Sequence, residues 1–297
     1  MRKALCSLCL FVFLAASVST AQAQVKLQLG FLVDGSGSIA SSDFQIIVNA
    51  LATALADPNL VPQDGTVEVC IVQFADVSAS TEVPPTVITS STIGTITQQI
   101  RNISQRGGGT PLWLGLDQIV ANISSSANFA TAQRQTINIA TDGEPRVPIQ
   151  SIDVAQGTTL SLAARDRAVN LGVDEIDAEG VGQATTGSNF QNFLLNVVWP
   201  QPGVLVNNGS LNGNFQPGFV ILVTQFQDFA QAVRDKVNAI VGSAGLGGNN
   251  EPGGTAAGPN GRPIPFDTPL GTVVLSLFLG LMLVLVRLRG SVSLMKK

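Results

Sequence analysis

Short apolar runs alternate with segments of helical periodicity along most of the chain. Four runs have the pattern of strands in a sheet: VKLQLGFLV from residue 25, TVEVCIVQF from 66, TINIAT from 136 and GFVILVT from 218. The first alternates early and becomes fully apolar late, as a central strand does. Apolar residues recur at helical spacing over 44–55, 93–103, 112–123, 160–171 and 226–240. This alternation predicts an α/β fold with a Rossmann-like, mostly parallel sheet and helices on both faces.

Other segments have a weaker pattern. The prolines of TEVPPTVIT (81–89) cannot donate to a sheet ladder, so we expect an antiparallel edge strand there. The charges of VDEIDAEGVG (173–182) favour a peripheral strand, and 194–217, without a clear period, is interpreted as a long loop. Ser42 followed by Gln45 is a capping-box pattern, which predicts that Ser42 caps a helix.

Both ends of the chain have the composition of targeting or membrane segments. Residues 1–23 contain Arg2 and Lys3, an apolar middle and a small-residue site at 21–23, the three parts of a secretory signal peptide. An uncleaved N-terminal anchor is the alternative. Residues 268–286 contain no charged side chain and are long enough for a transmembrane helix, with a buried core helix as the alternative.

The segments next to this span complete the expected organisation. Residues 287–297 are a basic tail, which the positive-inside rule places in the cytoplasm with the rest of the chain outside. Residues 242–265 are rich in Gly, Pro and Asn, which is typical of a flexible linker. One folded domain over 25–241 then remains. We therefore expect an exported, single-pass membrane or surface-anchored protein.

The net charge and the content of cysteine and histidine limit the kinds of partner and metal site that we expect. Between Lys26 and Asp267 the chain has 20 acidic and ten basic residues, so the exported part has a net charge near −10, which argues against nucleic acid as a partner. Cys70 alone would remain after signal cleavage, and its apolar surroundings predict a buried small side chain. The whole chain lacks histidine, which excludes a His-based zinc site.

Three polar clusters follow predicted strands or lie in loops beside them. Asp34, Ser36 and Ser38 follow the first strand, Thr110 ends the run RGGGT, and Asp142 follows TINIAT. In an open parallel sheet, ligands bind at the carboxyl ends of the strands. Two carboxylates and three hydroxyls form an all-oxygen set of the kind that Mg²⁺ prefers. Taken singly, each cluster is equally typical of a turn or a helix cap.

The motifs DGSGS, GGGT and TDG together resemble the three loops of the von Willebrand factor A (vWA) domain and its metal-ion-dependent adhesion site (MIDAS). The resemblance extends over about 27–241 and is greatest to secreted bacterial A domains. It implies that Ser36, Ser38 and Thr110 coordinate Mg²⁺ or Mn²⁺ directly, and that Asp34 and Asp142 act directly or through water. An open position on the cation would then attract an Asp or Glu side chain of a protein partner.

The function expected from this resemblance is metal-dependent protein binding or adhesion. The alternative is an envelope assembly or scaffolding factor whose A domain organises a larger complex. We do not expect an enzyme, because no activated nucleophile and no phosphate-binding loop followed by Lys is present. The segment IPFDTPLG (264–271), the span and RLR also resemble C-terminal sorting signals processed by exosortase-type enzymes, against the alternative of an ordinary permanent anchor.

Overall fold

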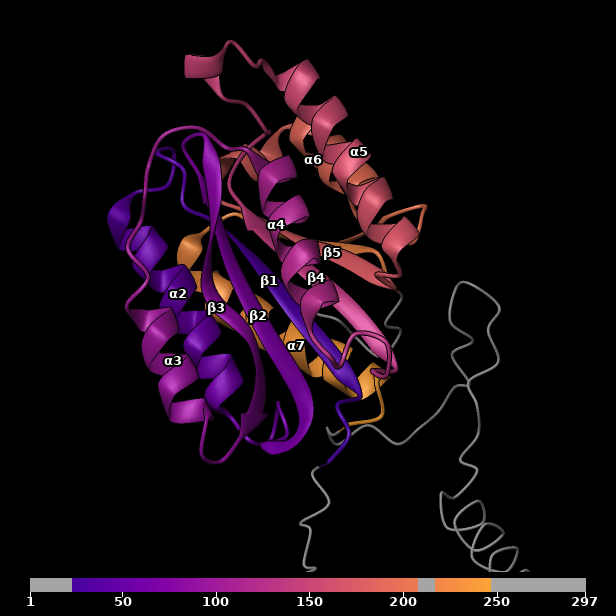
Figure 1. Cartoon of the computed structure of the whole chain (residues 1–297). Helices are drawn as coiled ribbons and strands as arrows, with labels where there is room; N and C mark the ends of the chain where they lie inside the picture. Colours follow the sequence, from indigo (N-terminus) through magenta and orange to yellow (C-terminus); the bar gives the residue numbers. More distant parts are fainter. Residues whose placement is uncertain (1–22, 208–216, 247–297) are drawn as a thin grey trace, which may run out of the picture. The chain divides into compact units, whose positions relative to one another are not determined.

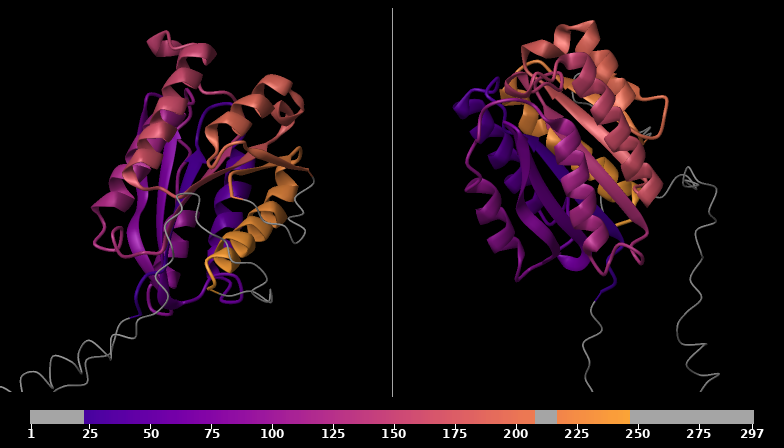
Figure 2. Two further views of the ribbon diagram at one scale, coloured as in Figure 1. Left: turned by 90° about the vertical axis from the view of Figure 1, so that its right-hand side faces the viewer. Right: turned by 45° about the horizontal axis from the view of Figure 1, so that its top comes forward.

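The computed structural model describes residues 23–207 and 217–246, and within them a seven-stranded sheet lies between two layers of helices (Figures 1 and 2). The strand order is β3-β2-β1-β4-β5-β7-β6. The strands are β1 (Leu27–Asp34), β2 (Asp64–Ala75), β3 (Ser78–Thr89), β4 (Arg134–Thr141), β5 (Glu175–Val181), β6 (Val204–Asn207) and β7 (Phe219–Val223).

Each face of the sheet has its own set of helices and its own apolar core. One face is covered by α2 (Ser41–Ala56), α3 (Ile93–Arg101) and α7 (Phe229–Ser243). The other is covered by α4 (Leu112–Ser125), α5 (Val154–Leu171) and α6 (Ser188–Val197). Short 3₁₀ turns lie at Pro148–Gln150, Gln183–Thr186 and Phe226–Asp228. The predicted α/β architecture, with helices on both faces, is confirmed.

Parallel pairing of the central strands positions the carboxyl ends that matter for function. β1 pairs in parallel with β2 on one side and β4 on the other, and all eight of its residues are buried. Its apolar sequence is therefore that of a strand covered on both faces. The ends of β1, β2 and β4 meet at the same edge, at the top of Figure 1. β3 is an edge strand antiparallel to β2, as its prolines predicted.

Three sequence interpretations of local structure are wrong: the loop over 194–217, the Ser42 cap and, as described below, the peripheral strand over 173–182. The region 194–217 contains the end of α6 and the strand β6, which pairs with β7, while 208–216 lie outside the described residues. β6 has only four residues, which is too short for a detectable period. Helix α2 begins at Ser41 with Ala40 as its N-cap and no side-chain cap, so Ser42 does not cap it.

Most of the expected targeting segments cannot be compared with the structure. The signal peptide (1–23, except for its last residue), most of the linker (242–265), the span (268–286) and the tail (287–297) lie outside the described residues. Helix α7 continues to Ser243, two residues beyond the expected end of the domain. Among the described helices, none is long and apolar enough to cross a membrane.

The acidic strand β5 is central and buried, not peripheral as its charges suggested. It lies between β4 and β7, and all seven of its residues are buried. Glu175, Asp177 and Glu179 alternate along it, so their side chains share one face of the sheet. From the sequence pattern alone, such charges are expected to be exposed to solvent. The pattern does not show the basic side chains that pair with them in the folded protein.

Those partners come from elements distant in the sequence. Lys236 of α7 has no exposed surface and forms an ion pair with Glu179. Arg134, at the start of β4, forms an ion pair with Glu175 with an N–O distance of 3.1 Å. Buried charges require such compensation, because transfer from water into the protein interior costs several kcal/mol per ion.

Asp177 lies between these two ion pairs and is held differently. Its Oδ1 accepts hydrogen bonds from the backbone amides of Gly218 at 3.0 Å and Phe219 at 3.1 Å. Asp177 Oδ2 and Glu175 Oε1 are buried without a hydrogen-bond donor among the described residues, and burial followed by the charge of Glu175 raises the pKa of Asp177 well above its usual value. Two neighbouring buried carboxyl groups are stabilised when one of them takes up a proton, so we predict that this pair shares one proton in the folded state.

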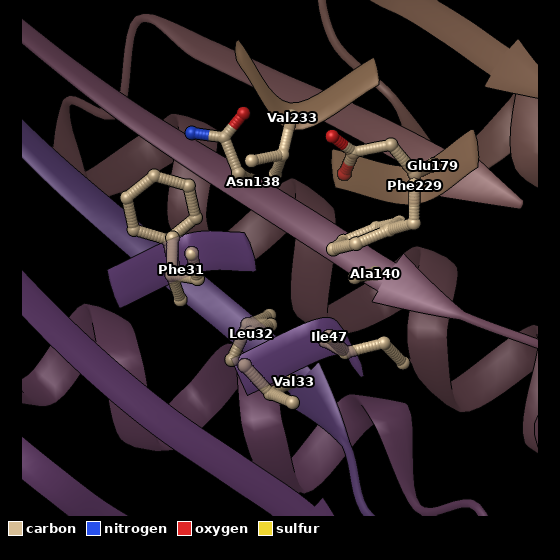
Figure 3. Close-up of a pocket in the computed structure, with 10 residues that line it drawn as sticks. Phe31, Leu32, Val33, Ile47, Asn138, Ala140, Glu179, Phe229 and Val233 are labelled. Atoms are coloured by element: carbon tan, nitrogen blue, oxygen red, sulfur yellow. The ribbon is translucent and has the colours of Figure 1, made fainter. Parts of the chain in front are cut away.

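The core beside this acidic strand has almost no free space. A cavity of about 10 Å³ lies between β1, β4, β5 and the two helices α2 and α7, with Asn138 and Glu179 at its border (Figure 3). Its other walls are apolar, including Phe229 and Val233 of α7. This volume is about that of one water-sized probe, so the cavity does not accommodate a substrate or cofactor.

We predict that Asp177→Asn makes the protein more stable at pH 8. As the pH rises above about 4, the unfolded chain ionises Asp177 while the folded chain keeps the proton, so folding stability falls with pH until the raised pKa is passed. Asparagine keeps the Oδ1 acceptor, can donate to Glu175 and removes this loss. We expect a melting temperature several degrees higher at pH 8, with the difference shrinking towards pH 4.

The matched variant on the same strand face is Glu179→Gln, which leaves Lys236 charged and buried without its partner. It should lower the free energy of unfolding by about 3–5 kcal/mol. Infrared difference spectra at pH 8 provide a direct check, because the carbonyl band of a protonated carboxyl should be weaker in Asp177→Asn than in the wild type. An Asp177→Asn protein less stable than wild type at every pH would contradict the shared proton.

Candidate metal centre

Three loops meet at the carboxyl edge of the sheet and bring the predicted site residues into one region. The first loop leaves β1 at Asp34, the second precedes α4 and contains Thr110, and the third leaves β4 and contains Asp142. Because β1 and β4 are parallel neighbours, their last residues end side by side. The structure therefore places all three loops where a parallel sheet binds its ligands.

Asp34 is a buried carboxylate at the end of a hydrophobic strand. Its side chain has no exposed surface. Oδ1 accepts a hydrogen bond from the backbone amide of Ser36 at 2.8 Å, and Oδ2 accepts one from the hydroxyl of Thr141 at 2.6 Å. Burial, and then the negative charge of Asp142, raise the pKa of Asp34 to about 7.

A chain of hydrogen bonds joins the first loop to the third. The hydroxyls of Ser36 and Ser38 lie 3.0 Å apart, and the Ser38 hydroxyl donates to Asp142 Oδ1 at 2.8 Å. Burial also raises the pKa of Asp142. Four of the five predicted site residues, Asp34, Ser36, Ser38 and Asp142, are thus in one connected group of oxygen atoms.

Thr110 is held beside this group by backbone pairing. Its amide donates to the carbonyl of Arg146 at 2.7 Å, and the amide of Arg146 donates back to the Thr110 carbonyl at 3.2 Å. This short bridge joins the second loop to the third, and Thr110 is buried. The backbone, and not the hydroxyl, is therefore what fixes the position of Thr110 among the three loops.

The first and second loops also pair with each other. The amide of Gly107 donates to the Gly35 carbonyl at 2.8 Å, and the amide of Gly37 donates to the Gly108 carbonyl at 3.0 Å. A Cβ on Gly37 would lie 3.2 Å from the amide nitrogen of Gly108. Glycine at position 37 therefore permits the close approach of the two loops.

Three residues that sequence analysis did not single out help to build the centre. Thr141 binds Asp34, and its only sequence signal is a hydroxyl at the end of an apolar strand. Gln73 of β2 is fully buried, and its Oε1 would lie 2.1 Å from a Cβ on Gly35. Gln105 donates to two backbone carbonyls of the first loop. Neither glutamine belongs to a recognisable motif.

The donor set fits a hard divalent cation. Among the ion pairs of the described residues, none involves Asp34 or Asp142. The charge of Arg146 acts on Asp142 from beyond ion-pair distance, and no basic side chain in the described part of the chain compensates Asp34. The oxygens of Ser36, Ser38 and Thr110 are neutral ligands of the kind Mg²⁺ accepts. No group of three His, Cys, Asp or Glu residues in the described chain is arranged to hold a metal. A cation here would therefore depend on hydroxyls as well as carboxylates.

Cys70 contributes nothing to this centre. It is buried on β2, and burial raises the pKa of its thiol to about 12. The thiolate, which is the form that binds metals, is thus strongly disfavoured. The prediction of a buried small side chain is confirmed.

The sequence of residues 28–197 matches the family model of the von Willebrand factor type A domain. This chain is a member of the vWA family. The match covers more than half of the chain and includes all three loops of the candidate metal centre. A comparison with curated proteins finds no match.

Solved structures of other A domains have the same fold. The vWF domain of the type V pilus tip protein Mfa5 from Porphyromonas gingivalis is 11% identical, with a TM-score of 0.55, and the alignment covers 77% of this chain and 99% of that one. The pilus adhesin SpaC from Lactobacillus rhamnosus GG is 15% identical, with a TM-score of 0.50 and coverages of 75% and 30%.

A third similar structure is proximal thread matrix protein 1 from the mussel byssus, at 17% identity and a TM-score of 0.49, with 73% of this chain covered. The vWA chain spans about half (49%) of that structure's length. At these identities the likeness concerns the fold of the A domain.

We predict that Gly35→Ala destabilises the A domain by about 1–3 kcal/mol, because overpacking strains a close contact. The new methyl group would displace the side chain of Gln73. That side chain is held by hydrogen bonds to the Ser104 carbonyl and the Arg106 amide. Gly143→Ala in the third loop is the matched control, since a Cβ at that position would have no atom within 4 Å. Chemical denaturation measures both, and equal stability of the two variants would contradict the close packing of Gly35.

Proposed function

We propose that this vWA protein is a metal-dependent protein-binding module and not an enzyme. The observation that carries the proposal is the group of oxygens at the carboxyl edge, in which Asp34 is buried next to Asp142 without a basic partner. Ser36, Ser38, Thr110 and the two aspartates would hold Mg²⁺ or Mn²⁺. A bound cation would supply positive charge with an open position, to which an Asp or Glu side chain of a partner binds.

The residues of the chain have distinct parts in this proposal. The Ser36 amide and the Thr141 hydroxyl orient the Asp34 carboxyl group, so its two oxygens are in position before a ligand binds. Ser36 and Ser38 provide neutral oxygens that leave part of the cation's charge uncompensated. That remaining charge is what would attract an acidic group from a partner. The adhesin character of SpaC is consistent with such a use of the fold.

We further propose that the domain is exported and anchored to a membrane or surface. The support is the composition of the two ends: the three-part signal sequence over 1–23 and the uncharged span over 268–286. Whether an exosortase-type enzyme processes the tail is decided by the mass of the mature protein, since cleavage would remove the span and the residues after it.

The first test is metal binding. Mg²⁺ or Mn²⁺ should raise the melting temperature of the wild-type protein, and calorimetry should detect binding. Asp34→Asn should abolish both effects. In the metal-free state this variant should melt at or above the wild-type temperature, because asparagine keeps the Oδ1 acceptor and removes a buried charge next to Asp142.

Asp166→Ala provides the control, since Asp166 is an exposed carboxylate on α5 paired with Arg165. It should leave metal binding unchanged. Equal metal binding by wild type and Asp34→Asn would refute the assignment of the site.

The second test concerns the partner. A partner that is first identified by cross-linking at the cell surface and then purified without the cross-link should bind in Mg²⁺, be released by EDTA and rebind after Mg²⁺ is restored. Ser36→Ala and Thr110→Ala should weaken its binding at least tenfold, with little loss of stability. If partner binding persists in EDTA, the cation is not the contact. If thermal melts collapse while the remaining folded protein still binds, the two hydroxyls have a structural role instead.

A further inference from the structure

Two glutamine side chains join the first and second loops of the candidate metal centre. Gln73 reaches from β2 into the second loop, where its Nε2 donates to the Ser104 carbonyl and its Oε1 accepts from the Arg106 amide, both at 3.0 Å. Gln73 has no exposed surface. It therefore fixes the backbone immediately before and after Gln105.

Gln105 in turn holds the first loop. Its Nε2 donates to the carbonyl of Ser36 at 2.9 Å and to that of Ile39 at 2.7 Å. Its Oε1 accepts from the hydroxyl of Ser41, the first residue of α2, at 3.0 Å. The orientation of the amide is determined by these partners, because a flipped amide would direct its oxygen at two carbonyls.

The hydrogen bonds of Gln105 to Ser36, Ile39 and Ser41 span the segment that contains both serines of the candidate metal site. Ser36 is contacted directly, and Ser38 lies between the two carbonyls that Gln105 binds. Gly35 and Gly37 surround Ser36 and give this loop a wide choice of backbone conformations. Without the amide, the loop would have to lose that freedom when a cation binds, which would reduce the affinity for the cation.

We propose that Gln105 is a positioning residue for the cation site: its amide holds Ser36 and Ser38 in the ligating arrangement without contributing a ligand. This inference rests on the proposed function, since it concerns the affinity of the same centre. Gln73 supports it by fixing the backbone from which Gln105 extends. In metalloproteins, residues that orient the ligands typically change metal affinity 10- to 100-fold when mutated.

The test is Mn²⁺ and Mg²⁺ titration of the full chain, purified in mild detergent, by calorimetry and by thermal melting with and without metal. Gln105→Leu removes all three contacts and should weaken metal binding about tenfold or more. Loss of the hydrogen bonds should lower the metal-free melting temperature modestly. Because metal binding is also weaker, the increase that the metal produces should shrink. A purely structural residue would lower the melting temperature equally in both conditions.

Gln105→Glu distinguishes the loss of the amide's positioning contacts from a change in charge near the cation. It keeps the shape and the acceptor for Ser41, but replaces the two N–H donors with an oxygen. A negative charge near the cation would by itself tighten metal binding, whereas loss of the donors should weaken it. Weaker binding supports positioning, and tighter binding overturns it. This variant also carries the test if Gln105→Leu does not fold.

Gln63→Leu is the matched control. Gln63 is also half-buried, and it donates to the carbonyl of Ala56 at 3.1 Å, at the far end of α2 from the site. Its metal affinity should equal that of the wild type. If wild type binds metal and Gln105→Leu binds it equally well, this inference is overturned and the proposed function stands. If wild type binds no metal, the proposed function fails and Gln105 is not a metal-positioning residue.

Discussion

The burial of the Asp34 carboxylate is the constraint on which the candidate metal centre depends. Asp34 ends a strand that is buried along its whole length, so its charge lies at the boundary between the apolar core and the loops. Hydrogen bonds from the Ser36 amide and the Thr141 hydroxyl orient it, but neither donor is charged. A buried carboxylate in this setting is stabilised by taking up a proton or by a nearby cation.

The same domain contains a second solution to the burial of acidic groups, on β5. There, Lys236 and Arg134 form ion pairs with Glu179 and Glu175. Asp177 accepts from two backbone amides, and burial raises its pKa. Compensation in that cluster comes from the chain itself and lies in the core. At Asp34 the described chain supplies no basic side chain, and the carboxylate lies where three loops meet. The β5 cluster is thus compensated within the core, whereas the oxygens around Asp34 are suited to an external cation.

The loops around Asp34 are shaped by contacts between backbone groups and amide side chains. Gly35 and Gly37 allow the first loop to pack against Gln73 and Gly108. Freedom of the glycine backbone would otherwise oppose a fixed arrangement of hydroxyls, and the pairing of the loops with each other and with Gln105 restricts it. The arrangement of the centre is thus a property of several loops together, and none of them forms it alone.

The sequence by itself determined the α/β class, the antiparallel edge strand and the identity of the loops that carry the candidate ligands. These follow from local features: apolar periodicity, prolines that cannot pair, and oxygen side chains at strand ends. The same local rules misplaced β5, because its charges are buried by partners about 40 and 60 residues away along the chain. They also missed Thr141, Gln73 and Gln105. Only the tertiary structure decided those roles, because a hydrogen bond between distant segments leaves no periodic trace in the sequence.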